Sequence, residues 1–380
     1  MPGIYLHIPF CKQACHYCDF HFSTSLQSKD DLLKALLKEV ELQKKYFTDA
    51  GEKKPIVQTV YFGGGTPSLL SGEEIESILD TIRKNFIVDD DAEITLEANP
   101  DDLSPVQLNT MRNAGINRLS IGIQSFDDAD LKWMNRVHTS ARAIESVKQA
   151  QEKGFDNITI DLIYGTPLLS DEQWKKNLEI AFALDVQHLS CYALTVEPRT
   201  ALAHLIAEKK QTGIDDAKQA AHFGILIDMA SKSGFEQYEI SNFARSMKYS
   251  RHNSSYWQGE KYLGLGPSAH SFNGDSRQWN IRNNAEYTRE INAGKIPFER
   301  ELLTPQNKFN EYIMTSLRTM WGCSLEKIRI DFGNDYAEIF FRQAMQKLTE
   351  GLLVQQRQYF TLSQKGKFFA DKIASDFFVV

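Results

Sequence analysis

The segment Cys11-Lys12-Gln13-Ala14-Cys15-His16-Tyr17-Cys18 places three thiols within eight residues. This spacing is too tight for a structural disulfide framework, which is typical of small secreted chains. Crowded thiolates repel one another unless a cation lies among them, so the C-x3-C-x2-C motif predicts a metal or iron–sulfur site. A cubane cluster usually has four cysteine ligands. Since the only other cysteines, Cys191 and Cys323, are far away in the sequence, one iron would stay open for an exchangeable ligand.

A structural zinc ion is the alternative interpretation of this motif. Zinc could bind the three cysteines and a fourth ligand from His16, His7 or His21. Common zinc sites, however, combine one short-spaced pair with a second, distant pair, and the sequence contains no such second pair. The motif therefore favours a cluster over zinc.

The composition is that of an ordinary globular protein. The chain has 380 residues, of which 42% are apolar and 24% are charged, and this length suffices for one large and one smaller domain. A net charge of −7 argues against a general nucleic-acid-binding protein, which normally carries a basic surface. We find neither a long apolar run nor the pattern of a signal peptide, and we therefore expect a cytoplasmic location.

Segments typical of strands and helices alternate over the first half of the chain. Such alternation predicts a parallel sheet with helices outside it. Six strands are compatible with either a doubly wound sheet or a barrel, and periodicity alone does not distinguish the two. The expected strands are 4–8, 57–62, 94–97, 118–123, 158–163 and 188–194, and the expected helices are 30–47, 75–82, 105–114, 127–134, 141–153 and 172–184.

Polar or glycine-rich residues recur at the carboxyl ends of these six strands. In parallel α/β folds, binding sites gather at the carboxyl ends of the strands. One such residue alone is explained as a helix cap, but six consecutive strands with this ending indicate a common site. The residues are the cysteine loop, Gly64-Gly65-Thr66, Glu97, Gln124, Asp161 and Tyr192-Ala193.

The second half of the chain changes character twice. A helix is expected at 217–231 and a strand at 235–240, and residues 241–300 are rich in Asn, Ser, Gly and aromatic residues. From about residue 305, two helices, a β-ribbon and a last helix predict a winged-helix-like domain. We therefore divide the chain into a barrel at 1–245, a connecting segment at 246–300 and a C-terminal domain at 301–380.

The cysteine motif, with Tyr17 before its third cysteine, resembles that of the radical S-adenosylmethionine (SAM) superfamily. This resemblance implies a 4Fe–4S cluster, SAM bound to its open iron, and an incomplete (β/α)6 barrel. Over its whole length, from Tyr5 to the C-terminal domain, the chain resembles the oxygen-independent coproporphyrinogen oxidases and their HemW-type relatives.

The resemblance implies a role for each matching position. Cys11, Cys15 and Cys18 are the expected cluster ligands. Glycine allows the backbone to approach SAM closely, and arginine suits its carboxylate. The expected SAM contacts are Tyr5, Tyr17, Gly64, Gly65, Thr66, Glu97, Gln124, Arg136, Asp161 and Ala193. Without the surrounding motifs, Arg136 would be read as a surface ion pair and Asp161 as a helix cap.

Two features separate this chain from the oxidases. The oxidases carry a further cysteine two residues after the third one, where this chain has Phe20, and they have an N-terminal extension before the first strand. The segment His252-Asn-Ser-Ser-Tyr-Trp257 instead matches the H-N-x-x-Y-W motif of the HemW-type haem chaperones. An imidazole can bind haem iron, and aromatic rings can cover a porphyrin. We therefore expect His252 as a haem ligand, Asn253 as its support, and Tyr256 and Trp257 as porphyrin contacts; the simpler alternative is that His252 and Trp257 only pack this segment against the barrel.

Three functions remain open at this point. The first is a haem chaperone that transfers haem to an acceptor haem protein, for example a respiratory one at a membrane. The second is a coproporphyrinogen III oxidase, and the third is a zinc-stabilised barrel of another function. The first is favoured by the H-N-x-x-Y-W motif and by Phe20. This function implies three cofactors or ligands: haem, SAM and a 4Fe–4S cluster. It also implies an electron donor and no nucleic-acid partner, with a homodimer as one arrangement. The protein would be cytoplasmic and would be peripheral at the membrane when it delivers haem. Whether SAM is cleaved, so that the protein is also an enzyme, stays open.

Overall fold

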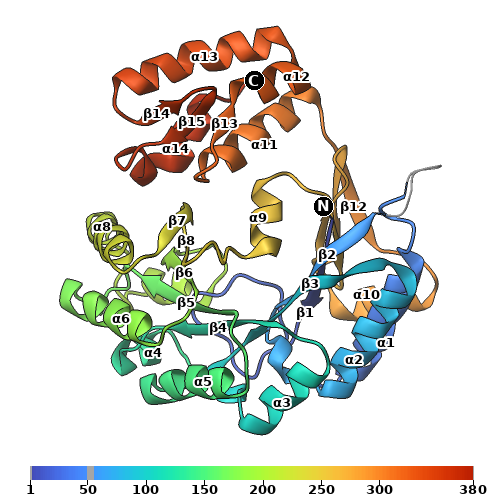
Figure 1. Cartoon of the computed structure of the whole chain (residues 1–380). Coiled ribbons are helices and arrows are strands. Elements are labelled where there is room, and N and C mark those ends of the chain that lie inside the picture. The colour runs from blue at the N-terminus through green and yellow to red at the C-terminus, as the bar shows by residue number, and fades with distance from the viewer. Residues whose placement is uncertain (1, 49–54, 380) are drawn as a thin grey trace.

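The computed structural model describes residues 2–48 and 55–379. Positions 1 and 380, at which the predicted barrel and C-terminal ranges begin and end, lie outside the described residues. The larger hydrophobic core runs from Ile4 to Ile291, and a second core runs from Phe309 to Phe377. The described part of the chain thus buries its apolar side chains in two main units, with the C-terminal unit above the barrel in Figure 1.

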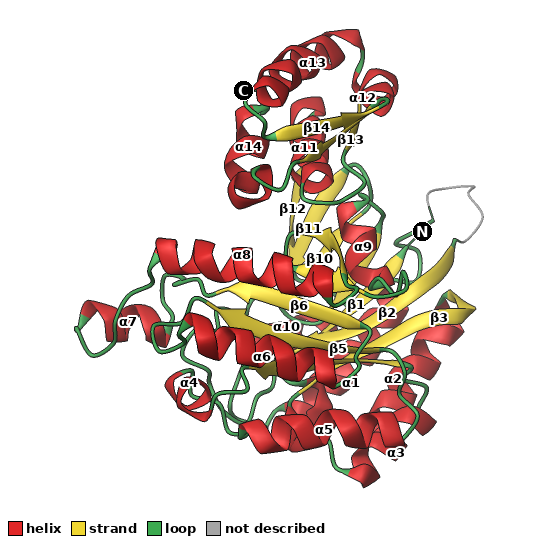
Figure 2. Ribbon diagram, turned by 60° about the vertical axis from the view of Figure 1, so that its left-hand side comes forward, coloured by secondary structure: helices red, strands yellow, loops and turns green. Residues whose placement is uncertain are grey.

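Six parallel strands and the helices that follow them form the barrel (Figure 1). The strands lie in chain order, and helices surround them on the outer side (Figure 2). The strands are β1 (Gly3–Ile8), β2 (Ile56–Gly64), β3 (Ile87–Ala98), β4 (Arg118–Gln124), β5 (Ile158–Tyr164) and β6 (His188–Ala193). The helices are α1 (Lys29–Leu42), α2 (Gly72–Asn85), α3 (Pro105–Asn113), α4 (Asp128–Trp133), α5 (Ser140–Glu152), α6 (Asp171–Ala183), α7 (Ala201–Ala207) and α8 (Asp216–Lys232). The predicted strand–helix alternation is confirmed.

Capping residues set the helix boundaries. Helix α2 begins with a capping box, in which the Ser71 hydroxyl accepts from the Glu74 amide and the Glu74 carboxylate accepts from the Ser71 amide. The same arrangement of Ser170 and Gln173 begins α6. Helix α1 ends at Leu42, five residues before the predicted end at 47. No helix in the described ranges is both long enough and apolar enough to cross a membrane.

The barrel is incomplete because β1 and β6 do not pair with each other. On one side β1 pairs with β9 (Tyr262–Leu265), and on the other β6 pairs with β8 (Asn242–Ala244). The remaining strands of this twelve-stranded sheet are β7 (Glu236–Glu239), β10 (His270–Phe272), β11 (Ser276–Asn280) and β12 (Phe298–Leu302). Helix α9 (Arg251–Trp257) precedes β9, and α10 (Asn284–Asn292) packs on α1. The segment 246–300, expected as a connector, therefore extends the barrel sheet itself.

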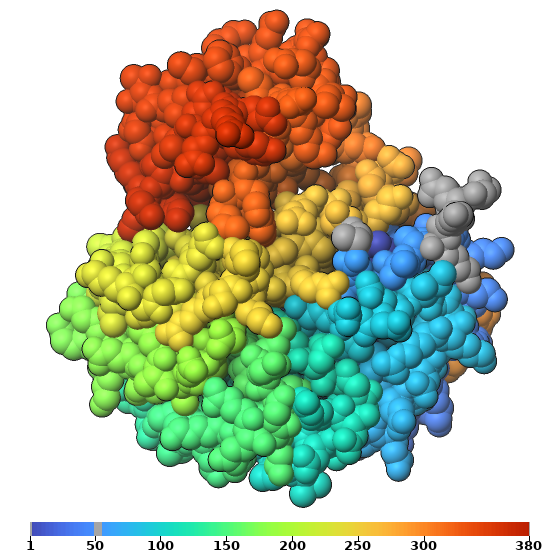
Figure 3. All heavy atoms as spheres, in the orientation of Figure 1, coloured from blue at the N-terminus to red at the C-terminus, as the bar shows by residue number. Residues whose placement is uncertain are grey.

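The C-terminal unit has the predicted winged-helix arrangement. Its strands form a small sheet in the order β13-β15-β14. Its elements are α11 (Pro305–Leu317), β13 (Cys323–Ser324), α12 (Leu325–Phe332), α13 (Asn334–Thr349), β14 (Leu353–Gln356), β15 (Tyr359–Leu362) and α14 (Ala370–Asp376). The amide of Ile240 donates to the Arg318 carbonyl, and the amide of Met320 donates to the Tyr238 carbonyl. These bonds join the unit to the barrel, and the orange and red atoms rest on the yellow ones in Figure 3.

Candidate functional site

A cavity of about 1070 Å³ lies at the carboxyl ends of the barrel strands. Its wall is formed by the cysteine loop, by strand ends and by residues 367–372 of the C-terminal unit. Twelve of the thirteen residues predicted to bind the cluster or SAM line it. They are Cys11, Cys15, Tyr17, Cys18, Gly64, Gly65, Thr66, Glu97, Gln124, Arg136, Asp161 and Ala193.

The cysteine loop is held by its backbone, which leaves its thiols available. The amide of Cys11 donates to the Ser23 carbonyl (3.0 Å), and that of His16 donates to the Met134 carbonyl (3.2 Å). All three cysteines of the loop are half-buried and free. Burial, with a smaller contribution from the neighbouring thiols, raises the pKa of Cys18 to about 11. A cationic iron cluster would reverse this shift, so the donor set fits the cluster.

The three histidines proposed as zinc ligands are engaged elsewhere. Both ring nitrogens of His7 are hydrogen-bonded, Nδ1 to the Tyr5 hydroxyl and Nε2 to the His21 carbonyl. The Nε2 atom of His21 lies 2.7 Å from Asn284 Oδ1, and Nδ1 of His16 lies 3.0 Å from the Trp133 carbonyl. Among residues 2–48 and 55–379, no three His, Cys, Asp or Glu side chains are placed to hold a single metal ion. The geometry therefore gives the zinc interpretation no support.

The glycine turn after β2 brings bare backbone to the cavity. Gly64 has φ of +105°, and a Cβ atom there would lie 2.5 Å from Nδ1 of His7. A Cβ atom on Gly65 would lie 2.7 Å from the Ile8 carbonyl oxygen, to which the Gly65 amide donates. Both positions therefore require glycine, and the turn can lie close to a ligand without a side chain in between.

Two buried carboxylates face the cavity. Glu97 accepts from the Tyr61 hydroxyl (2.8 Å) and from the Gly64 amide (3.1 Å), and burial raises its pKa to about 7. Asp161 accepts from the Ser120 hydroxyl (3.3 Å), and burial raises its pKa to about 6. A bound cation would favour the ionised form of both groups. The pair therefore suits a ligand with positive charge and hydroxyl groups, as SAM has.

Arg136 is part of the cavity wall and not a surface ion pair. Its Nη2 atom donates to Asn99 Oδ1 (2.6 Å) and to the Gly122 carbonyl (2.8 Å), and Nη1 donates to Sγ of Cys15 (3.3 Å). Its buried Nε has no hydrogen-bond partner in the described structure. Nearby, Gln124 ends β4 with φ of +66°, a strained backbone of the kind found at functional sites. A guanidinium fixed in this way suits the carboxylate of SAM.

Tyr5 is the predicted SAM contact that does not reach the cavity wall. Its ring stacks on that of Tyr61, with centroids 6.0 Å apart, and its hydroxyl is bound to His7. The sequence interpretation missed two residues that fix the site, Tyr61 and Asn99. Asn99 lies two residues after Glu97 at the end of β3, so its position after the strand was a usable indication.

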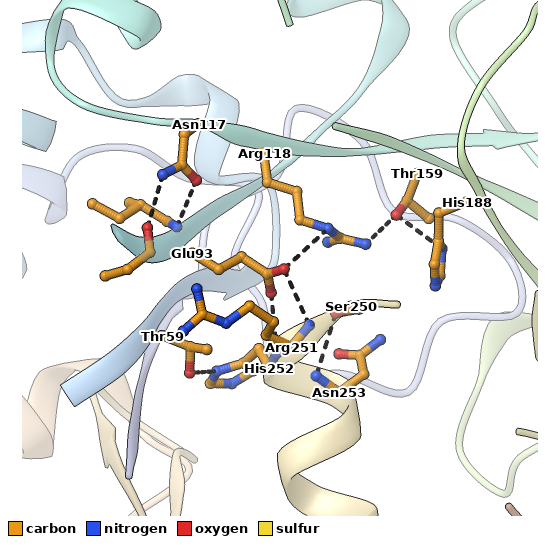
Figure 4. Close-up of polar contacts among 12 residues, drawn as sticks. Thr59, Glu93, Asn117, Arg118, Thr159, His188, Ser250, Arg251, His252 and Asn253 are labelled. Atoms are coloured by element: carbon orange, nitrogen blue, oxygen red, sulfur yellow. Dashed lines mark hydrogen bonds and ion pairs between the residues drawn. The ribbon is translucent and has the colours of Figure 1, made fainter. Parts of the chain in front are cut away.

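Helix α9 carries His252, which the structure buries to 1% exposure. Its Nδ1 lies 2.7 Å from Thr59 Oγ1 and its Nε2 lies 2.9 Å from the Tyr256 hydroxyl, and the Thr59 contact is drawn in Figure 4. The ring also stacks on Tyr61, with centroids 4.9 Å apart. Burial lowers the His252 pKa to about 3, so the imidazole is neutral. Both ring nitrogens thus have protein partners in this structure, and the haem-ligand role of His252 stays a prediction.

The other residues of the H-N-x-x-Y-W motif point to different places. Asn253 lines the cavity. Tyr256 packs edge-on against Tyr262, with ring centroids 4.5 Å apart, and Trp257 lies under the guanidinium of Arg318 at 5.3 Å. These four side chains therefore do not form one porphyrin-binding surface. His252 packs α9 against the barrel, Trp257 contacts Arg318 of the C-terminal unit, and Asn253 faces the cavity.

Comparison with known proteins gives consistent results over the whole chain. The model of the radical SAM superfamily matches residues 5–181, and that of the HemN C-terminal domain matches residues 303–369. The heme chaperone HemW of Mycobacterium tuberculosis (strain ATCC 25618 / H37Rv) is 36% identical over 376 residues, which cover 98% of this chain and 93% of the relative. The heme chaperone HemW of Bacillus subtilis (strain 168) is 32% identical over 380 residues, covering 99% of each chain.

A solved structure shares the whole architecture. Coproporphyrinogen III oxidase (HemN) from Escherichia coli, described as a radical SAM enzyme, superposes with a TM-score of 0.84 at 25% identity. The match covers 100% of this chain and 90% of the oxidase. Identity to the HemW proteins is higher than identity to this oxidase, over a similar share of the chain. The chain therefore belongs to the HemW family of the radical SAM superfamily.

Proposed function

We propose that this protein is a haem chaperone, which binds haem and transfers it to an acceptor haem protein, and which carries a 4Fe–4S cluster with exchangeable SAM. The observation that carries this proposal is the similarity to proteins named heme chaperone HemW over nearly the full length of the chain. The cavity supports it, because the residues suited to the cluster and to SAM meet there.

The residues of the cavity have separable tasks in this proposal. Cys11, Cys15 and Cys18 hold the cluster, which supplies an open iron for SAM and an electron for its reductive cleavage. Arg136 pairs with the SAM carboxylate. Glu97 and Asp161 favour the positive charge and the hydroxyl groups of the same ligand, and the strands β3 and β5 that carry them fix their positions.

Coproporphyrinogen III oxidation is the second candidate, and the similarity to the E. coli oxidase favours it. Against it stands Phe20, which replaces the further cysteine expected of the oxidases two residues after Cys18. The side chain of Phe20 lines the cavity and is exposed there. The position therefore presents an apolar ring where the oxidases are expected to have a thiol.

The partners of the chaperone are part of the proposal. The cluster needs an electron donor, and the haem needs an acceptor, which we propose to be a respiratory haem protein at a membrane. We propose a cytoplasmic location, from which the chain is peripheral at the membrane when it delivers haem. A homodimer is one arrangement to test, by the mass of the purified protein in solution.

The test is an anaerobic haem titration of the cluster-reconstituted chain, followed by its Soret absorption. Saturable binding, and then loss of the bound haem to an added apo haem protein, supports the chaperone. Coproporphyrinogen III is assayed in parallel, with SAM and a reductant. Its decarboxylation without saturable haem binding would replace the chaperone proposal by the oxidase.

A further inference from the structure

We infer that the edge strand β12 is a docking site for a partner protein, which adds an extended segment to the sheet and carries Lys or Arg opposite Glu299 and Glu301. This inference goes beyond the proposed function and does not depend on it. Strand β12 (Phe298–Leu302) is the last strand at one end of the twelve-stranded sheet and lies below the C-terminal unit in Figure 1.

The opposite edge of the same sheet is already covered. That edge is β7, and a segment of the C-terminal unit runs beside it. The Met320 amide donates to the Tyr238 carbonyl (3.0 Å), and the Ile240 amide donates to the Arg318 carbonyl (3.1 Å). In the part of the chain that the structure describes, no segment pairs in this way with the outer side of β12.

Every second residue of β12 turns its backbone polar groups away from the sheet. The Ile281 amide donates to the Pro297 carbonyl (2.9 Å), and the Leu303 amide donates to the Asp275 carbonyl (2.9 Å). Residues that exchange hydrogen bonds alternate along an antiparallel ladder, so the odd-numbered residues bond to β11 and the even-numbered ones face outward. The outward residues are Phe298, Arg300 and Leu302. Each has an amide and a carbonyl for which the described residues offer no partner.

The strand lacks most features that prevent strand addition. Natural sheet edges are blunted by bulges, by proline, by a covering element or by charged side chains. Strand β12 keeps an unbroken register with β11, contains no proline, and exposes all of its residues. On one of its faces Phe298 is 38% and Leu302 75% exposed, so an added strand would find apolar contacts there. Its charged side chains then decide which strand can pair with it.

Two carboxylates lie on the other face of β12. They belong to Glu299 and Glu301, and neither has an ion-pair partner among the residues that the structure describes. Trp279 lies across from Glu299 on β11, and Arg277 lies across from Glu301. The Arg277 guanidinium is already held by Glu311 of α11, with Nε and Nη2 each 2.8 Å from a carboxylate oxygen. A strand with Lys or Arg opposite these carboxylates would form cross-strand charge pairs, which stabilise a sheet.

The same carboxylates disfavour a second copy of this chain as the added strand. Two copies of β12 that pair antiparallel about a twofold axis at Arg300 would place Glu299 opposite the Glu301 side chain of the second copy. An axis at Glu299 or Glu301 would place that residue opposite itself. Like charges directly opposite each other destabilise a sheet. The edge therefore selects against self-association and for a basic partner.

The test measures binding of a short fluorescent peptide to the reconstituted full chain by fluorescence polarisation. Its central sequence is Val-Lys-Glu-Lys-Val, which in antiparallel register places lysines opposite the carboxylates of β12. Binding should be saturable, and a peptide with glutamate in place of both lysines should bind about tenfold more weakly or worse. N-methylation of the central residue, whose amide would pair with Arg300, should also weaken binding about tenfold or more. N-methylation of the lysines, whose amides face away from β12, should have little effect.

Protein variants test the charge selection from the other side. Glu299→Lys/Glu301→Lys should reverse the preference, so that the glutamate peptide binds about tenfold more tightly than the lysine peptide. Glu179→Lys/Glu338→Lys is the matched control, because it changes the net charge equally at exposed helical positions outside β12. This control should keep the preference of the unmodified chain.

Each contrary result overturns the inference and leaves the chaperone function standing, because haem titration measures that function separately. The absence of saturable binding of the lysine peptide to the unmodified chain is one such result. Equal effects of N-methylation at both sets of positions would show contact through side chains without strand pairing. Self-association of the unmodified chain in sedimentation, lost in Arg300→Pro, would assign the edge to a second copy.

Discussion

The cysteine loop, residues 11–18, and helix α9 both carry side chains able to bind a metal, but their polar atoms have different surroundings. The three cysteines of the loop are half-buried. Backbone hydrogen bonds, such as that from the Cys11 amide to the Ser23 carbonyl, hold the loop in place. On α9, His252 is fully buried and both of its ring nitrogens have partners. The loop leaves its thiols available to a ligand, whereas the contacts of His252 hold α9 in position.

The anchoring of α9 continues beyond His252. The Glu93 carboxylate accepts from the amides of Arg251 (3.1 Å) and His252 (3.0 Å), and it lies 3.7 Å from the buried Arg118 guanidinium (Figure 4). Buried polar groups are almost always paired. The imidazole of His252 has both ring nitrogens engaged in this way, whereas the three loop thiols form no disulfide and can take a cluster.

The largest effect is expected in the loop. Cys15→Ser removes one of three cluster ligands, so iron, measured as atoms per chain after reconstitution, should fall from about four to well under one. The melting temperature of the chain without its cluster should change by less than about 2 °C, because the thiol is half-buried and fills no core. Ala14→Ser, in the same loop, is the control that keeps the iron. Full iron content in Cys15→Ser would show that the motif is not the cluster site.

The next largest effect is expected under α9. Glu93→Ala leaves the Arg118 charge and two backbone amides without their partner, and it should lower the free energy of unfolding by about 3–5 kcal/mol. Urea denaturation measures this loss. Glu76→Ala, at an exposed position of α2, should cost less than about 0.5 kcal/mol. A loss under about 1 kcal/mol in Glu93→Ala would contradict the anchoring of α9 by this carboxylate.

These two regions also show how far the sequence can be interpreted. The alternation of the first six strands is readable because parallel strands are buried on both faces and form short apolar runs, as Ile4 to Ile8 does. Strands β10 to β12 are short and rich in polar residues, and β9 has only four residues, so their pattern does not separate them from a loop. Their place beside β1 is set by a parallel pairing between residues about 260 positions apart, such as Gly3 and Tyr262.

The candidate site could be predicted from the sequence to a similar extent as the fold. Twelve of the thirteen positions predicted for the cluster and SAM line the cavity, and most of them lie in or just after strands whose carboxyl ends the topology brings to one edge. The hydrogen bond of His252 could not be predicted from the sequence, since its partner Thr59 lies 193 positions away. Lys367 and Phe369 belong to no motif, and only the folded chain places them beside the cysteine loop.

A smaller effect is expected for His252 itself. His252→Ala removes two side-chain hydrogen bonds and a stacked ring and leaves the Thr59 hydroxyl buried without its partner. The free energy of unfolding should fall by about 2–3 kcal/mol, as urea denaturation can show. The iron content of the folded variant should be that of the unmodified chain. A fully stable variant that no longer binds haem would mean that His252 serves a ligand and not the fold.

The smallest effect concerns the pH dependence of SAM binding. Burial raises the pKa of Glu97 to about 7 and that of Asp161 to about 6, so both are largely protonated at pH 5 and ionised at pH 8. The sulfonium of SAM keeps its charge throughout this range and favours the ionised carboxylates. Affinity for SAM should therefore rise with pH, and the dissociation constant should be about tenfold higher at pH 6 than at pH 8.

Glu97→Gln separates this effect from the ionisation of SAM. The amide keeps the shape of the side chain and an acceptor for Tyr61 or Gly64, but it does not titrate. Calorimetric titrations of both proteins at several pH values give the ratio of their affinities, in which the proton equilibria of SAM cancel. The ratio should favour the unmodified chain increasingly between pH 6 and 8 and level off above pH 8. A ratio independent of pH would show that Glu97 stays protonated beside SAM, so that its carboxyl group acts as a hydrogen-bonding group and not as a charge.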